Sequence, residues 1–210
     1  MRVFLAGASG VIGTRLISLL RQNGHTVAGL TRTPAKAAML NELGAQPVVC
    51  DVFDAAALTR AVVDAAPDIV IHELTDLPDD PAKIADFRER HARIRIEGTH
   101  NLVAAAREAA VARLLAQSVA WPMAPGPGQA AVDELERSVL AYGGLVLRYG
   151  QFYGPGTFHV DEPPAGPRVE IQRAAEATVA ALHEPTGVLV ITDEGAVRAD
   201  AAVVPAAKEN

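Results

Sequence analysis

The chain has 210 residues, of which 50% are hydrophobic and 21% charged, a composition typical of a globular protein with room for one domain of ordinary size. Its net charge of −6 argues against general nucleic-acid binding, which requires a basic surface. No apolar run approaches the roughly 20 residues needed to cross a bilayer, and the apolar start does not read as a signal peptide. The single cysteine excludes an internal disulfide framework. We therefore expect a cytoplasmic protein that does not bind membranes.

Strand-like and helical segments alternate along the chain. We expect strands at residues 2–6, 26–31, 46–50, 68–72, 112–118, 144–149 and 187–192. Helices are expected at residues 11–23, 34–43, 54–65, 82–109, 129–142 and 170–183, the long segment forming one helix or two. Such alternation is typical of an α/β fold in which a parallel sheet carries helices on both faces.

Residues 7–13 read Gly-Ala-Ser-Gly-Val-Ile-Gly and join the first expected strand to the first helix. Gly7 allows a sharp turn, Gly10 leaves room for a pyrophosphate against the backbone, and Gly13 lets the helix pack closely on the strand. Free N–H groups of the first helical turn then favour phosphate. This context predicts a Rossmann-type doubly wound parallel sheet of about seven strands that binds a dinucleotide. The contacting residues are expected to be Gly7, Ser9, Gly10, Val11, Ile12 and Gly13.

Arg32 follows the second expected strand, where a Rossmann-type site distinguishes its cofactors. An acidic side chain there would bond the adenosine ribose and repel a 2′-phosphate. A guanidinium instead pairs with phosphate, so the predicted cofactor is NADP, with NAD as the alternative. The competing interpretation of Arg32 is a solvated side chain near a helix start. The histidines are scattered without ligand spacing, so no metal is expected.

Further motifs follow the glycine loop in a fixed order. They are Cys50-Asp51-Val52-Phe53-Asp54, Val70-Ile71-His72, Glu97-Gly98-Thr99-His100-Asn101-Leu102, Ala116-Gln117-Ser118 and Arg148-Tyr149-Gly150-Gln151-Phe152-Tyr153-Gly154-Pro155-Gly156. The series resembles the extended or atypical short-chain dehydrogenase/reductase superfamily, and within it the NAD-dependent epimerase/dehydratase group. We expect a single domain with a cofactor-binding core at residues 1–156 and a reduced substrate-side region and tail at 157–210.

The resemblance implies an NAD(P)-dependent oxidoreductase or epimerase acting on a carbonyl or hydroxyl carbon of a small organic molecule. It implies that Asp51 contacts adenine, with the adjacent Val52 backbone reading the ring, and that His72 forms part of the cofactor wall. Asp54 is better suited to cap the following helix.

Catalysis is where the chain departs from the family, whose hydride-transferring members use a tyrosine followed four residues later by a lysine. No such pair occurs here. Ser118 remains from the familiar catalytic set and could orient a carbonyl. Tyr153 is a candidate proton donor by analogy, and Glu73 and Asp76 are candidate acids if they are desolvated, although acidic loop residues are mostly solvated.

His91 and Arg95 lie one helical turn apart and are expected on a charged surface face, Arg95 standing where the family often has asparagine. The Pro/Gly-rich stretches at residues 121–129 and 154–167 are expected to form the substrate pocket walls. The pocket is expected to be shallow or completed by a second copy of the chain, which makes a homodimer possible. The alternative function is an NADP-binding sensor, or a scaffold that catalyses a redox-neutral cyclisation or isomerisation.

Overall fold

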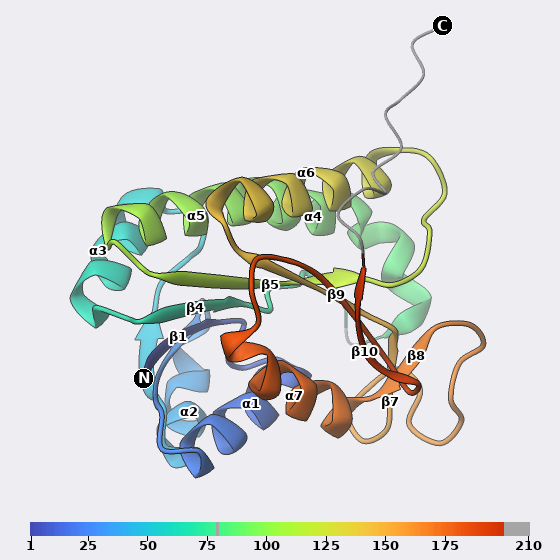
Figure 1. The fold of residues 1–210 in the computed structure, drawn as a ribbon, viewed down its shortest axis with the longest axis horizontal. Coiled ribbons are helices and arrows are strands. Elements are labelled where there is room, and N and C mark those ends of the chain that lie inside the picture. Colours follow the sequence, from blue (N-terminus) through green and yellow to red (C-terminus); the bar gives the residue numbers. More distant parts are fainter. Residues whose placement is uncertain (79, 200–210) are drawn as a thin grey trace, which may run out of the picture.

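The computed structural model describes residues 1–78 and 80–199, which are built around one eight-stranded sheet (Figure 1). The strand order is β10-β9-β6-β5-β4-β1-β2-β3. The strands are β1 (Arg2–Ala6), β2 (Thr26–Thr31), β3 (Gln46–Val49), β4 (Ile69–His72), β5 (Arg113–Val119), β6 (Leu145–Tyr149), β9 (Gly187–Thr192) and β10 (Gly195–Ala199). A second ladder pairs β7 (Gln151–Tyr153) with β8 (Arg168–Glu170).

All neighbours in the large sheet are parallel except β9 and β10. The chain starts in the middle of the sheet, and β1 pairs with β2 on one side and β4 on the other. Ala6 of β1 is in register with Leu30 of β2 and His72 of β4, so these three strands end at the same edge. The strand order reverses at this point, which is where doubly wound sheets bind their ligands.

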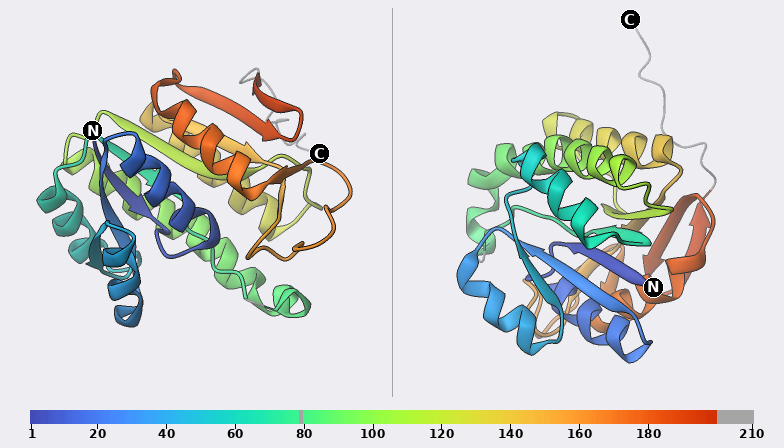
Figure 2. Two further views of the ribbon diagram at one scale, coloured as in Figure 1. Left: turned by 90° about the horizontal axis from the view of Figure 1, so that it is seen from below. Right: turned by 90° about the vertical axis from the view of Figure 1, so that its left-hand side faces the viewer.

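Helices cover both faces of the sheet (Figures 1 and 2). One face carries α1 (Val11–Gln22), α2 (Ala37–Glu42) and α7 (Ile171–Ala180), and the other carries α3 (Ala55–Ala65), α4 (Arg88–Arg93), α5 (Thr99–Glu108) and α6 (Pro127–Tyr142). Short 3₁₀ turns occupy Pro34–Lys36, Pro81–Phe87 and Ala181–His183. A π-helical turn at Ile94–Gly98 separates α4 from α5.

Two hydrophobic clusters form, one on each face, because successive strand residues point to opposite sides. Leu5 of β1 packs with Leu16 and Leu20 of α1 beneath the sheet. Phe4, its neighbour, packs with Leu58 of α3 and the helices on the other face. A strand that is buried on both faces has a continuous run of apolar residues in its sequence, and β1 is such a strand.

The predicted α/β fold is confirmed, and the seven predicted strands end within one residue of those observed. The strands β7, β8 and β10 were not predicted; β10 pairs antiparallel with β9, in a segment expected to be an irregular tail. The end of that expected tail, residues 200–210, lies outside the described residues. The segment expected to be one or two helices at 82–109 is broken by the 3₁₀ and π turns. None of the described helices is long and apolar enough to span a membrane.

Candidate functional site

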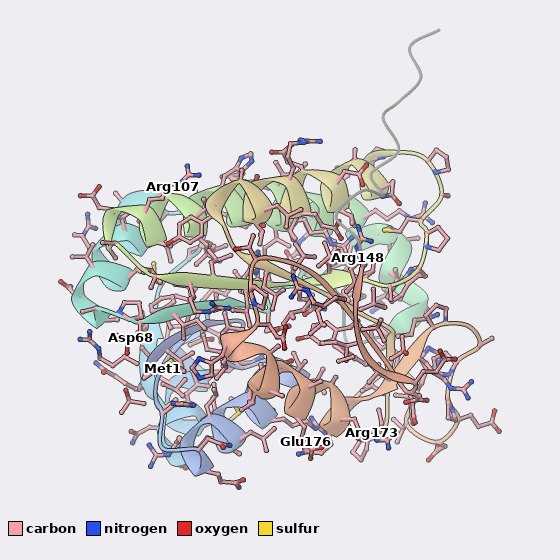
Figure 3. All side chains as sticks on the ribbon, viewed as in Figure 1. Met1, Asp68, Arg107, Arg148, Arg173 and Glu176 are labelled. Carbon is pink, nitrogen blue, oxygen red and sulfur yellow. The ribbon has the colours of Figure 1, made fainter. Side chains whose placement is uncertain are left out.

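A cavity of about 1120 Å³ lies at the carboxyl edge of the sheet. It is slightly larger than the roughly 300–1,000 Å³ of pockets for drug-sized ligands. Its lining comes from the glycine loop, the end of β2, the loops after β3 and β4, and the two Pro/Gly-rich loops that were predicted to form its walls. In Figure 3, Met1 and Asp68 label the opposite edge of the sheet and Arg148 labels β6.

The glycine loop leaves no space for side chains at two of its positions. Gly7 has φ +90°, and a Cβ there would lie 2.5 Å from the Glu73 carbonyl oxygen. A Cβ on Gly13 would lie 2.2 Å from the Gly7 carbonyl oxygen. Gly10 differs: its Cβ would approach only that oxygen, at 3.2 Å, and otherwise the position faces the cavity. A pyrophosphate could therefore reach the backbone here, because Gly10 is the N-cap residue of α1 and provides no side-chain cap.

Eight of the ten predicted cofactor residues line the cavity: Gly7, Ser9, Gly10, Val11, Ile12, Arg32, Asp51 and Val52. Asp51 also accepts a hydrogen bond from the Phe53 N–H at 3.0 Å. Asp54 caps α3 by accepting from Ala57, as predicted. Gly13 and His72 are not among the described residues that line the cavity.

His72 is fully buried behind the cavity, which does not support the wall role expected from the resemblance. Its Nδ1 accepts from the Leu74 N–H at 3.2 Å, and its Nε2 lies 2.9 Å from the Thr99 hydroxyl oxygen. Burial, reinforced by the Arg95 charge, lowers the pKa of His72 to about 4. The neutral ring therefore donates through Nε2 to Thr99 and holds the end of β4 against α5.

Arg32 is not simply solvated. Its guanidinium lies 3.0 Å from Oδ1 of Asp76, and Arg90 approaches the same oxygen at 3.1 Å. Asp76 itself is buried, with 6% of its side chain exposed, although a solvated loop acid was expected. Two guanidiniums thus share one carboxylate, which leaves a surplus positive charge beside the end of β2.

Glu73 is also buried, again contrary to the expectation for a loop acid. Its Oε1 lies 3.1 Å from the Tyr149 hydroxyl, whereas its Oε2 is enclosed and has no partner among the described residues. Burial raises the pKa of Glu73 to about 8, with the Tyr149 hydrogen bond opposing this shift.

The hydroxyls of Tyr149 and Thr178 form a short hydrogen-bonded chain beside Glu73. Thr178 donates to the Ala174 carbonyl at 2.7 Å, and its oxygen lies 2.6 Å from the Tyr149 hydroxyl. The Tyr149 hydroxyl donates to Oε1 of Glu73, so this contact favours the carboxylate form and partly offsets the effect of burial on the pKa of Glu73.

Neither predicted catalytic hydroxyl is placed to act on a substrate. Ser118 lines the cavity, but its Oγ donates to Oε1 of Glu136 at 2.6 Å. Its hydrogen is therefore not available to polarise a carbonyl. Tyr153 is not among the described residues lining the cavity, and its hydroxyl lies 3.2 Å from both carboxylate oxygens of Asp193. The proposed proton-donor role of Tyr153 is therefore not supported.

Glu136 was missed by the sequence reasoning. It is 2% exposed on α6, and Arg148 binds both of its oxygens, at 2.8 and 2.6 Å. The sequence pattern that could have indicated its burial is its position on the apolar stripe of that helix, with Val132 one turn before it and Val139 one turn after it.

His91 and Arg95 do not form the expected charged surface face, because both line the cavity. Arg95 is 9% exposed, and its only hydrogen-bonding contact within the described part of the chain is with the Met123 sulfur, 3.7 Å from Nη1. Burial first, and then the Arg95 charge, lowers the pKa of His91 to about 4.

The comparisons with known proteins agree with this architecture. The NAD dependent epimerase/dehydratase family matches residues 3–143. A 3-diazoavenalumate denitrifying reductase of a Streptomyces species is 39% identical over 239 residues, covering 92% of this chain and 76% of that protein. The alignment is longer than this chain, so the reductase contains segments that the chain lacks.

Two further proteins are similar to different fractions of this chain. A 4-hydroxy-2-methyl-3-oxo-4-farnesyl-3,4-dihydroquinoline-1-oxide ketoreductase of Stigmatella aurantiaca is 32% identical over 134 residues, 64% of this chain and 38% of that protein. The UDP-glucose 4-epimerase of Thermus thermophilus, solved in complex with NAD, has a TM-score of 0.75 at 21% identity, covering 94% of this chain and 79% of that chain. The latter similarity shows a shared fold.

Replacing Gly10 tests where the dinucleotide binds. Gly10→Val places a branched side chain at the cavity surface, so we expect calorimetric binding of NADPH to be abolished. Gly10→Ala should weaken binding less. Both variants should keep their circular dichroism and melting behaviour, since the added Cβ meets only one backbone atom. Tight NADPH binding by a folded Gly10→Val protein would place the ligand elsewhere.

Replacing Glu73 tests its buried proton. Below pH 4.5 the carboxyl is protonated in both folded and unfolded chains, but between 4.5 and about 8 only the folded chain retains the proton. Its contribution to the free energy of unfolding should therefore fall with rising pH, by about 1.4 kcal/mol per unit. Glu73→Gln should become progressively more stable than the wild type across this window, as measured by urea unfolding. The exposed Glu108→Gln serves as the control; a parallel pH dependence in wild type and Glu73→Gln would contradict this assignment.

Proposed function

The chain belongs to the NAD-dependent epimerase/dehydratase family, and on that premise we propose that it is an NADPH-dependent reductase whose substrate accepts hydride without a proton from the protein. The family is enzymatic, and the relatives of this chain include named reductases and dehydrogenases. When bound, the reduced nicotinamide supplies a hydride.

The observation that carries this proposal is that no acid among the described residues is placed to give a proton to a substrate. The chain lacks the tyrosine–lysine pair, Ser118 directs its hydrogen to Glu136, and Tyr153 contacts Asp193. Glu73, whose pKa is raised to about 8, also lines the cavity, but the residue is only 4% exposed, its Oε2 is enclosed and its Oε1 accepts from Tyr149. Reduction of a ketone requires a proton as well as a hydride, and a protein acid typically contributes about 10²–10⁴-fold to such a rate. This site favours a substrate that needs no proton.

A diazonium compound meets that requirement. The relative that aligns over most of this chain is named a denitrifying reductase of a diazo substrate. In the reaction that we propose, a C–H bond replaces the C–N bond of the substrate, and N₂ departs with the electron pair of the broken bond. The positive charge of the diazonium group is neutralised by the hydride, and NADPH becomes NADP⁺, so atoms and charges balance without a proton.

The preference for NADPH is supported by the charges near β2. Arg32, Arg90 and Asp76 together retain one positive charge, and Lys36 also lines the cavity. Arg32 could bind a 2′-phosphate if its guanidinium gave up part of its contact with Asp76. No acidic side chain follows β2 directly to bind a free 2′-hydroxyl.

Cofactor preference is tested by titration. We expect wild-type protein to bind NADPH more tightly than NADH, and Arg32→Ala to reduce the ratio about tenfold, the order expected for a charge-assisted hydrogen bond. Arg2→Ala is the matched control, because Arg2 is an exposed arginine paired with Asp68 at the opposite edge of the sheet. Equal affinities of the wild type for NADPH and NADH, or an unchanged ratio of these affinities in Arg32→Ala, would show that Arg32 does not bind the 2′-phosphate.

The reaction is tested in a single turnover with benzenediazonium as the substrate. We expect loss of the NADPH absorbance together with release of one equivalent each of N₂ and benzene. The folded Gly10→Val protein controls for reaction in free solution. A panel of ketones should be reduced much more slowly, since no described side chain of the site is placed to donate a proton to them.

Two outcomes would contradict the proposal. Equal rates for wild type and Gly10→Val would show that the protein does not catalyse the reduction. Substrate conversion at unchanged NADPH absorbance would replace hydride transfer with the redox-neutral alternative.

A further inference from the structure

Arg95 occupies an unusual position for a charged side chain. It lies in the π-helical turn Ile94–Gly98, which separates the end of α4 from the start of α5. Such turns are rare and frequently occur at functional sites. The residue is 9% exposed, yet it lines the cavity, so its small accessible surface belongs to the wall of the site.

The guanidinium lacks an acidic partner among residues 1–78 and 80–199. Its one contact there, with the Met123 sulfur at 3.7 Å, involves a weak acceptor and only one of its five N–H groups. The nearby carboxylate of Glu136 already accepts from Ser118 and from two nitrogens of Arg148. An unpaired buried charge is costly, so its retention calls for a ligand that is not part of the chain.

The neighbouring titratable groups do not neutralise Arg95. Burial lowers its pKa to about 10, with the charge of Glu136 opposing this shift, and the side chain is still cationic at neutral pH. The pKa values of His72 and His91 are both lowered to about 4, so these rings are uncharged. Asp76, which faces His91, is shared by Arg32 and Arg90. A local positive charge therefore persists at this end of the cavity.

We propose that Arg95 is the receptor for a carboxylate on the substrate, held near Ser118 and the Trp121–Met123 loop. This inference rests on the proposed function in placing the substrate in this cavity. The guanidinium fork matches the two oxygens of a carboxylate. Trp121 and Met123 also line the cavity and provide apolar surface for a flat hydrocarbon attached to it. The substrate class is thus a planar organic acid.

Binding of cinnamate and its neutral counterpart cinnamamide tests the proposal without turnover. Calorimetry uses the full chain with saturating NADP⁺, so that no hydride is available. We expect cinnamate to bind at least tenfold more tightly than cinnamamide. Arg95→Met should abolish this preference, Arg95→Lys should retain part of it, and the affinity for NADP⁺ should be unchanged.

Arg93→Met is the matched control, because Arg93 lies two residues away, is exposed and pairs with Glu97 at 2.6 Å. Its loss should leave cinnamate binding unchanged. Arg95→Met should also melt at the wild-type temperature or above, since it removes an uncompensated buried charge. A purely structural arginine would instead lower the melting temperature of the variant, and that result would overturn the proposal.

Several other results would overturn it. They are failure of cinnamate to bind the wild type at millimolar concentration, equal binding of acid and amide, an undiminished preference in Arg95→Met, and a loss of NADP⁺ affinity in that variant. A loss of NADP⁺ affinity would show that Arg95 binds the cofactor and not the substrate. Arg95-dependent binding of cinnamate without oxidation of NADPH by any diazonium compound would remove the proposed reduction but leave the carboxylate site in place.

Discussion

The close backbone contact between the glycine turn and the end of β4 is the constraint on which the site depends. A Cβ at Gly7 would overlap the Glu73 carbonyl oxygen, and one at Gly13 would overlap that of Gly7. Only a chain without side chains at both positions can bring α1 so close to β1 and β4. This contact places the start of α1 at the cavity and exposes Gly10 on its surface. It also fixes the backbone of Glu73, whose side chain is buried against Tyr149.

Buried charge is distributed unevenly around the cavity. The carboxylates of Asp76 and Glu136 are both engaged by arginines, whereas Arg95 has no such partner among the described residues. The surplus charge near Arg32 lies beside β2, and that of Arg95 lies toward the loop containing Met123. The proposed cofactor phosphate and substrate carboxylate would each meet one of these charges. Stability and ligand binding therefore oppose each other in this cavity, since isolated cations favour anionic ligands but destabilise the protein without them.

The fold could be predicted from the sequence because its signals are local. Apolar runs such as residues 2–6, together with the glycine spacing at residues 7–13, specify strand, turn and helix without reference to distant residues. The short strands β7 and β8 were missed because three residues carry too little periodicity, and their pairing depends on segments that are distant in sequence.

The site was only partly predictable, because burial of a charge depends on tertiary contacts. Glu73 and Asp76 follow a strand in a loop, where solvated acids are usual, yet Tyr149 and two arginines enclose them. Arg95 was expected on a charged surface face because it follows His91 by one helical turn, but which way that face points depends on tertiary packing, and both residues line the cavity. Ser118, predicted to be catalytic, does line the cavity, but its hydrogen bond to Glu136, 18 residues away, could not be read from the sequence.

We propose that hydride transfer here proceeds without a proton from the protein. The most direct measurement is the rate constant for NADPH oxidation in a single turnover with a diazonium substrate, determined in H₂O and in D₂O at equivalent acidity. We expect the same rate constant in both solvents, because no exchangeable hydrogen moves in the step. A markedly slower reaction in D₂O would show that a proton is transferred with the hydride, and would contradict it.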